Sequence, residues 1–92
     1  MIEKVAVATV QGKTYFLIVN KLREQNIPFI SLVPGEPVPP KIMIVITSEQ
    51  EKHLINHQKI LVLQGEGELE SLIGHVKVLL LEKEPTKKLL SA

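Results

Sequence analysis

Four short aliphatic runs constrain the fold of this chain more than any other feature of its sequence. Each run consists mainly of Val, Ile, Leu and Ala, and they lie within residues 5–10, 29–33, 42–47 and 59–64. A strand with one solvated face alternates polar and apolar residues, whereas a run without alternation indicates a strand buried on both faces. Such strands are typical of parallel sheets. The runs therefore predict an α/β fold with a four-stranded parallel sheet.

Helical periodicity between these runs predicts three helices. Residues 14–25 carry one apolar stripe, formed by Tyr15, Ile18, Val19 and Leu22. Residues 68–82 carry a second, formed by Leu69, Leu72, Ile73, Val76 and Leu80. Ser48 and Glu51 match the capping box, in which a serine and a glutamate three residues later satisfy the first amides of a helix. We therefore expect a short third helix over residues 49–56, with Leu54 and Ile55 facing inward.

The connection between the second and third runs is rich in proline. Residues 34–40 contain four prolines, which excludes a helix or an inner strand and favours polyproline II geometry. An extended segment of about eight residues spans about 25 Å, enough to return the chain to the start of a parallel strand. Right-handed crossovers then favour the strand order 2-1-3-4, in a three-layer or partly open sandwich. Strands 1 and 3 are predicted to be central, with the topological switch point between their carboxyl ends.

The composition excludes several kinds of chemistry. The ten acidic residues are all glutamate and there is no cysteine, so phosphoacceptor aspartates, aspartate-based magnesium sites, Ser-His-Asp triads and thiol nucleophiles are not available. His53 and His57 have helical i, i+4 spacing, but no third ligand is apparent, so we expect no metal site. The chain is expected to be one domain over residues 1–82 with a basic tail over 83–92. We predict no enzymatic activity and no cofactor.

Gly12-Lys13-Thr14 matches the last three residues of a phosphate-binding loop, between a predicted strand and a predicted helix. The leading glycine of that motif would fall at Val7, and no aspartate is available as a magnesium anchor. One interpretation is a tight structural turn with a solvated lysine. Another is an anion- or nucleotide-binding site formed by Gly12, Lys13 and Thr14, together with Thr47 and Ser48 from the neighbouring loop.

A protein partner is the other functional prediction. Only three helices are expected to cover two sheet faces, so one face is predicted to be thinly covered. Candidate partner contacts are the apolar end of the last helix and the tail, at Val78, Leu79, Leu81, Leu89 and Leu90. We expect a protein partner or a homodimer. The net charge of +1 argues against strong direct nucleic-acid binding, and no apolar run is long enough to span a membrane. The absence of cysteine and of a recognisable signal or transit segment predicts a cytoplasmic location.

Three segments of the chain resemble an archaeal protein family of unassigned function. They are Val5-Ala6-Val7-Ala8-Thr9 leading to Gly12-Lys13, the sequence LVPGEPVP at residues 32–39, and Ile44–Ser48 before an acidic segment. In longer relatives a similar domain precedes a nuclease-like domain of the RNase H or Holliday-junction-resolvase class. The resemblance implies an accessory module beside DNA- or RNA-processing machinery in an archaeon. The nuclease carboxylates have no counterpart here, so no catalytic residue is carried over. The predominance of Glu and Lys is compatible with a thermophile.

Overall fold

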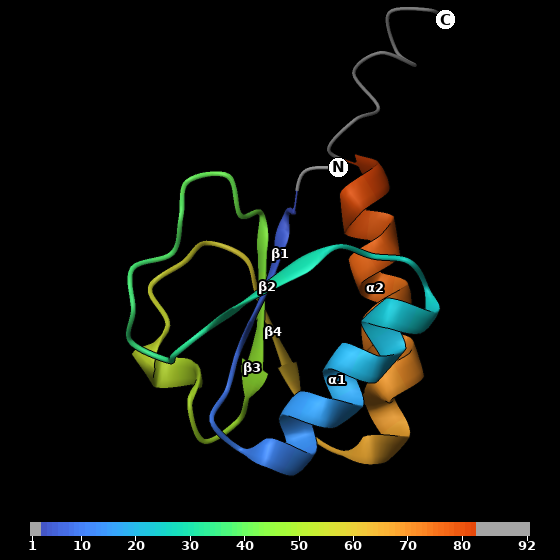
Figure 1. Ribbon diagram of the computed structural model, residues 1–92, viewed down its shortest axis with the longest axis horizontal. Coiled ribbons are helices and arrows are strands. Elements are labelled where there is room, and N and C mark those ends of the chain that lie inside the picture. The colour runs from blue at the N-terminus through green and yellow to red at the C-terminus, as the bar shows by residue number, and fades with distance from the viewer. Residues whose placement is uncertain (1–2, 83–92) are drawn as a thin grey trace, which may run out of the picture.

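A four-stranded parallel sheet forms the centre of the computed structural model, which describes residues 3–82 (Figure 1). The strands are β1 (Val5–Ala8), β2 (Phe29–Leu32), β3 (Ile44–Ser48) and β4 (Ile60–Leu63), in the order β2-β1-β3-β4. In the register of the sheet, Val5 lies opposite both Phe29 and Ile44. The predicted parallel sheet and its strand order are confirmed.

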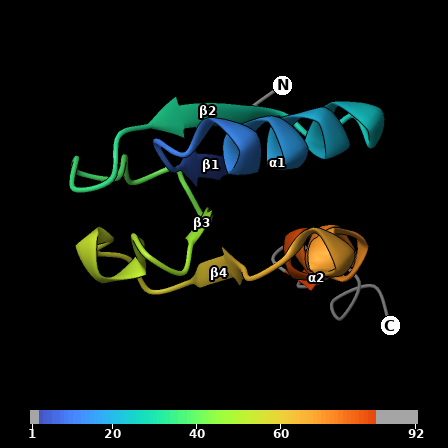
Figure 2. The same ribbon diagram turned by 90° about the horizontal axis from the view of Figure 1, so that it is seen from below.

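Two helices cover the same face of this sheet (Figure 2). Helix α1 (Gly12–Glu24) follows β1, and helix α2 (Leu69–Glu82) follows β4 after the 3-10 turn η2 (Glu66–Glu68). Helix α1 ends where Asn26 takes the left-handed conformation at φ 58° and the amide of Ile27 donates to the carbonyl of Leu22 at 2.9 Å. Asparagine tolerates this conformation better than most residues, which explains a sharp helix end at this point.

The core lies on both faces of the sheet, but different structures cover the two faces. On the helical face, α1 and α2 pack against the odd-numbered residues of β1, and the buried cluster includes Val5, Val7, Ile18, Leu22, Ile46, Ile73 and Val76. On the other face a smaller cluster joins Ala6, Ala8, Ile42 and Val45, with Val38 and Ile55 packed against it. Irregular segments cover this second face.

The predicted third helix is wrong. Residues 49–56 form turns that include only the short 3-10 helix η1 (Lys52–Leu54), so the described part of the chain has two α-helices. Ile55 packs on the sheet as expected, but Leu54 is 47% exposed. A segment with one aliphatic anchor has no apolar stripe with which to stabilise a two-turn helix. The capping box is also absent, because the Ser48 hydroxyl donates to the Glu51 carboxylate rather than accepting from an amide.

The proline-rich connection crosses the second face without a helix, as predicted. It begins with a tight turn in which the Glu36 amide donates to the Val33 carbonyl at 2.9 Å and Gly35 has φ 98°. A positive φ at this position favours glycine because a side chain would be strained there. Val38 then packs on the sheet, and β3 begins parallel to β1. Among residues 3–82, no helix has the length and apolar character needed to cross a membrane.

Candidate functional site

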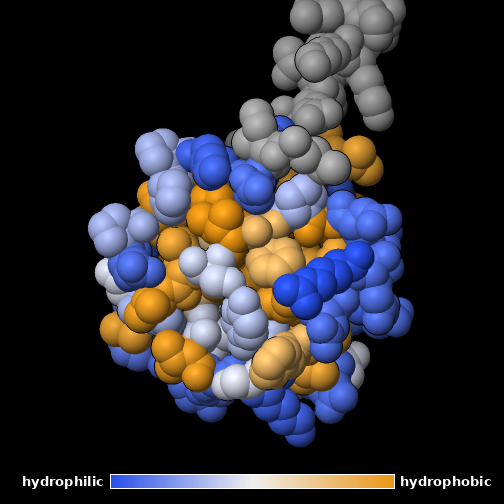
Figure 3. Space-filling view, viewed as in Figure 1, coloured by the Kyte–Doolittle hydropathy of each residue, from blue (hydrophilic) through white to orange (hydrophobic). Residues whose placement is uncertain are grey.

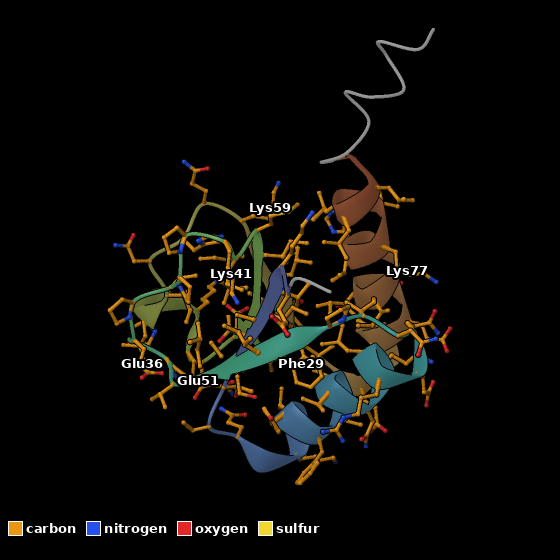
Figure 4. All side chains as sticks on the ribbon, turned by 45° about the horizontal axis from the view of Figure 1, so that its top comes forward. Phe29, Glu36, Lys41, Glu51, Lys59 and Lys77 are labelled. Carbon is orange, nitrogen blue, oxygen red and sulfur yellow. The ribbon has the colours of Figure 1, made fainter. Side chains whose placement is uncertain are left out.

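The carboxyl ends of β1 and β3 meet at the topological switch point of the sheet. From β1 the chain continues into α1 on one face, and from β3 it continues into the irregular segment on the other face. The two exits diverge, which in open α/β sheets leaves a crevice where ligands commonly bind. At this end of the sheet lies the side chain of Glu51, from the segment that follows β3, where it reaches the residues that follow β1 (Figure 4).

Glu51 is the centre of a hydrogen-bond network that is buried at Thr9 and Ser48 and partly buried at Val10. Its Oε1 atom accepts from the hydroxyl of Thr9, and also from the hydroxyl of Ser48 at 2.8 Å. Its Oε2 atom accepts from the backbone amide of Val10 at 3.0 Å. The residue is only 7% exposed. One carboxylate therefore joins the loop after β1, the end of β3 and the irregular segment that covers the second face.

The network favours the ionised form of this carboxyl group. Burial raises the pKa of Glu51, but the hydrogen bonds from Thr9, Val10 and Ser48 together outweigh burial, so the pKa lies below its usual value. All three donors bind the charged form better than the neutral form. Glu51 is consequently a fixed anion at neutral pH rather than a group ready to exchange a proton.

Neighbouring polar groups complete the network. The amide of Gln11 donates to the Thr9 hydroxyl oxygen at 3.1 Å, so Thr9 both accepts and donates. The Thr47 hydroxyl donates to the Ala8 carbonyl at 2.6 Å and holds the ends of β1 and β3 together. Within residues 3–82, every buried side-chain polar atom has a hydrogen-bond partner. The hydroxyls at this end of the sheet are thus engaged by groups of the chain itself.

This arrangement does not provide acid–base or nucleophilic catalysis. General-base catalysis needs a group with a pKa near the working pH and access to a substrate proton. Glu51 has a lowered pKa, is buried, and already accepts three hydrogen bonds. Its arrangement instead resembles that of a bound anion satisfied by hydroxyls and an amide. Its role here is to connect three segments of the fold.

The local sequence pattern around Glu51 predicts a helix cap and gives no indication of this role. Its main partner, Thr9, lies 42 positions away in the chain. The sequence does contain one indication of this contact. Glu51 lies in the loop after the central strand β3, and the hydroxyl residue Thr9 directly follows the neighbouring central strand β1. Loops at the carboxyl ends of adjacent parallel strands come together, so this combination predicts a contact.

The residues predicted to bind an anion are partly brought together. Gly12, Lys13 and Thr14 form the first turn of α1 rather than a separate loop. Lys13, Thr14 and Ser48 line a surface depression of about 220 Å³ beside this helix start. Thr47 is fully buried and does not line it. Two carboxylates, of Glu49 and Glu66, also line the depression and oppose the binding of an anion there. Anion binding at this place stays a prediction.

The residues predicted to contact a partner differ in exposure. Val78 and Leu81 are 51% and 64% exposed on α2, whereas Leu79 is half-buried against the core. Leu89 and Leu90 lie outside the described residues. Figure 3 shows the side of the molecule on which β2 lies, where hydrophobic residues gather near the middle and hydrophilic residues surround them. Exposed aliphatic surface is therefore present at more than one place.

Comparison with known proteins gives one match. A sequence model of the response regulator receiver-like domain matches residues 4–72, which include the whole sheet, α1 and the start of α2. Neither the curated proteins nor the solved structures include a match. The order β2-β1-β3-β4 equals the first four strands of the flavodoxin-like order 2-1-3-4-5, so the fold agrees with this match. The resemblance to accessory domains of nuclease-like proteins is not tested and stays a prediction.

Proposed function

Because the chain belongs to the response regulator receiver-like domain family, we propose that it is a non-catalytic protein-interaction module with a permanently occupied switch point. Receiver-like domains are generally regulatory modules without catalysis of their own. The observation that carries the proposal is the Glu51 network, in which a carboxylate of the chain accepts hydrogen bonds from three donors at the switch point. An incoming anionic group would have to displace it from all three donors.

The absence of aspartate supports the same conclusion from the sequence. A module regulated through an aspartyl phosphate needs an exposed aspartate at this end of the sheet, and the chain has none. A phosphate group changes a surface by adding charge and strong acceptors. Glu51 provides a negative charge that is always present and hydrogen-bonded. The module is therefore proposed to present one constant surface to its partner.

The module's inertness toward phosphoryl donors can be measured directly. We expect no added phosphoryl mass when the full chain is incubated with acetyl phosphate and Mg²⁺ and analysed by intact-protein mass spectrometry. A receiver-like domain with an accessible phosphoacceptor is the positive control. Stable incorporation that Glu51→Gln abolishes would overturn the proposal of a permanently occupied site.

The interaction itself needs a matched pair of proteins. The wild-type chain and the variant Val78→Glu/Leu81→Glu would be immobilised and exposed to a lysate of the source organism, because both residues are exposed on α2. We expect a specific protein to be retained by the wild type and reduced with the variant. Circular dichroism checks that both proteins are folded. Equal retention by both would exclude this end of α2 as the contact.

A small anion- or nucleotide-binding domain is a second candidate function. The observation in its favour is the depression beside the start of α1, where Lys13 and Thr14 lie next to Ser48. Helix starts attract anions through their free amides. Thermal unfolding with inorganic phosphate, ADP and ATP, compared between wild type and Lys13→Ala, tests this function. A ligand-dependent rise in Tm that Lys13→Ala removes would support it, and no shift in either protein would reject it.

Association with DNA- or RNA-processing machinery is the more specific form of the first proposal and rests on the resemblance alone. Nucleic acid is then an indirect partner, reached through an enzyme that processes it. Repeating the pull-down with and without nuclease treatment separates the two routes. Retention of a nucleic-acid enzyme after nuclease treatment would support the association. Loss of the retained protein after treatment would contradict a direct protein contact.

A further inference from the structure

Strand β4 forms one edge of the sheet. It pairs with β3 on its inner side, and within residues 3–82 no strand pairs with its outer side (Figure 2). Three of its four residues, Ile60, Leu61 and Val62, are only half-buried, whereas all four residues of β1 are at most 1% exposed. The residues of β4 are therefore as apolar as those of an inner strand, although the strand lies at an edge where three of them are partly exposed to solvent.

The backbone of β4 presents hydrogen-bonding groups along this open side. The amide of Val45 donates to the carbonyl of Lys59 at 3.0 Å. The backbone N–H and C=O groups that face β3 therefore belong to the odd-numbered residues of this segment. In a parallel ladder the intervening residues direct both their N–H and C=O groups the other way. Ile60 and Val62 consequently face outward with donors and acceptors that an added strand would satisfy.

The two edge strands of the sheet differ in the groups that flank them. Along β2, the Arg23 guanidinium lies 5.9 Å from the centre of the Phe29 ring, and the Glu36 carboxylate accepts from the amide of Val33 at 2.7 Å. A proline follows directly at position 34. Charged groups and proline are the usual means of preventing pairing at an edge strand. Neither strand contains a charge or a proline within its own four residues, but β2 has Pro28 directly before it and Pro34 two residues after it, whereas no proline lies this close to β4.

Helix α2 extends the apolar surface next to this edge. A depression of about 200 Å³ lies between β4 and α2 and is lined by Leu61, Val62, Leu72, His75 and two further residues of this region. Farther along the same side of the helix, three positions after His75, Val78 is 51% exposed. Stable interfaces bury about 800 Å² per partner, which a strand edge of this length does not reach alone. The helix side supplies additional area.

The charges at the two ends of β4 are opposite in sign. Lys59 precedes the strand, and Glu66 and Glu68 follow it, all three exposed and without an ion pair among the described residues. In an antiparallel pair of two identical strands, the lysine end of each lies beside the glutamate end of the other. A parallel pair would bring like charges together. The edge is therefore complementary to a second copy of itself when the two run antiparallel.

We propose that the outer edge of β4 and the adjoining side of α2 pair with the same surface of a second copy, forming a continuous antiparallel junction between two sheets. A two-fold axis passes near Val62, and Lys59 of each copy lies near Glu66 and Glu68 of the other. This inference rests on the proposed interaction function and names a second copy of the chain as the partner. Each copy has a net charge of only +1, so electrostatic repulsion between the two copies is small.

Sedimentation velocity of the full chain tests the proposal. The monomer has a mass of 10.3 kDa, and we expect a concentration-dependent species of twice that mass between about 1 μM and about 1 mM. Val62→Pro removes an outward amide while leaving the inward ladder to β3, and we expect it to raise Kd by about tenfold or more. A chain that stays monomeric over this range would overturn the inference. The pull-down described above would remain an independent test of the interaction function.

A charge exchange distinguishes this surface from other modes of dimerisation. We expect Lys59→Glu and Glu66→Lys/Glu68→Lys each to weaken self-association by about tenfold, because each places like charges at the junction. Mixing the two variants should restore a dimer at wild-type concentrations, since every junction then pairs opposite charges. Lys77→Glu is the matched control on the α1 side of α2, where Lys77 contacts Gln25. Dimerisation that Lys59→Glu leaves unchanged, or that mixing fails to restore, would contradict the proposed surface.

Discussion

Replacing Glu51 with glutamine tests whether the charged carboxylate holds the three segments at the switch point together. The wild-type side chain accepts hydrogen bonds on both oxygens, from Thr9 and Ser48 on one and from Val10 on the other. Glutamine has almost the same shape, but one of its two terminal groups is an NH₂ group that only donates. In Glu51→Gln, either the Val10 amide or the two hydroxyls must therefore lose their acceptor.

The size of the effect follows from the partners. A hydrogen bond to a charged group contributes about 1.5–3 kcal/mol, and a buried donor left unpaired costs about 1–3 kcal/mol. The hydroxyls of Thr9 and Ser48 can rotate, whereas the backbone amide of Val10 cannot. We expect Glu51→Gln to lower the free energy of unfolding by about 2–3 kcal/mol. For a domain of this size, the loss corresponds to a decrease in Tm of roughly 10–20 °C.

Urea unfolding at pH 7, followed by far-UV circular dichroism, measures this loss. An unchanged m-value would show that the variant unfolds with the same exposure of surface. Glu49→Gln is the matched control, because Glu49 is exposed and makes only a surface ion pair with Lys52 at 2.9 Å. We expect the control to stay within about 0.5 kcal/mol of wild type. A Glu51→Gln protein as stable as this control would refute the structural role of the carboxylate.

The lowered pKa of Glu51 predicts that the stability of the wild type and that of Glu51→Gln depend differently on pH. The pKa of Glu51 in the folded protein is lowered, because the three hydrogen bonds outweigh the effect of burial, so the group binds protons more readily after unfolding. Its contribution to stability is complete above the unfolded-state pKa and is lost as pH falls through the folded-state pKa. The wild type should therefore lose more stability than Glu51→Gln on acidification below about pH 5. Equal losses in both proteins would refute this assignment.

Three further substitutions test other parts of the fold by the same urea titration. Leu22→Ala removes a fully buried side chain between α1 and the sheet, and we expect a loss of about 2–5 kcal/mol; a loss near zero would contradict its position in the core. Asn26→Val forces a β-branched residue to φ 58° and should cost about 1–2 kcal/mol, whereas Asn26→Gly should not; equal effects would argue against the left-handed conformation. Thr47→Val removes the hydroxyl that donates to Ala8 and should cost about 1 kcal/mol, and a clear gain in stability would show that this bond is dispensable.

The sheet could be predicted from the sequence because its determinants are local. Runs without polar alternation indicate strands buried on both faces, and the described strands lie within or at the edges of those runs. The proline-rich residues 34–40 exclude a helix by covalent structure alone, and the crossover they form contains none. Strand order then follows from the handedness of crossovers, which is nearly invariant in proteins.

The candidate site could not be predicted in the same way because its determinants are distant in sequence. Ser48 and Glu51 satisfy a local helix-capping pattern, and that pattern gives no information about Thr9. In the folded chain, three hydrogen bonds at the switch point compete with the short helix, which has only Ile55 as a packed anchor. The tertiary network determines the conformation of this segment, and local propensity does not.

The unequal cover of the two sheet faces has a consequence for native-state hydrogen exchange. Strand β1 is buried between both layers, so its amides should exchange only when the whole domain unfolds. The irregular layer has few apolar anchors, among them Val38 and Ile55, and should open at a lower free energy. Glu51 attaches part of that layer to the ends of β1 and β3. Residues around η1 should consequently exchange more slowly than the proline-rich crossover, which has no comparable attachment to the carboxyl ends of the central strands among the described contacts.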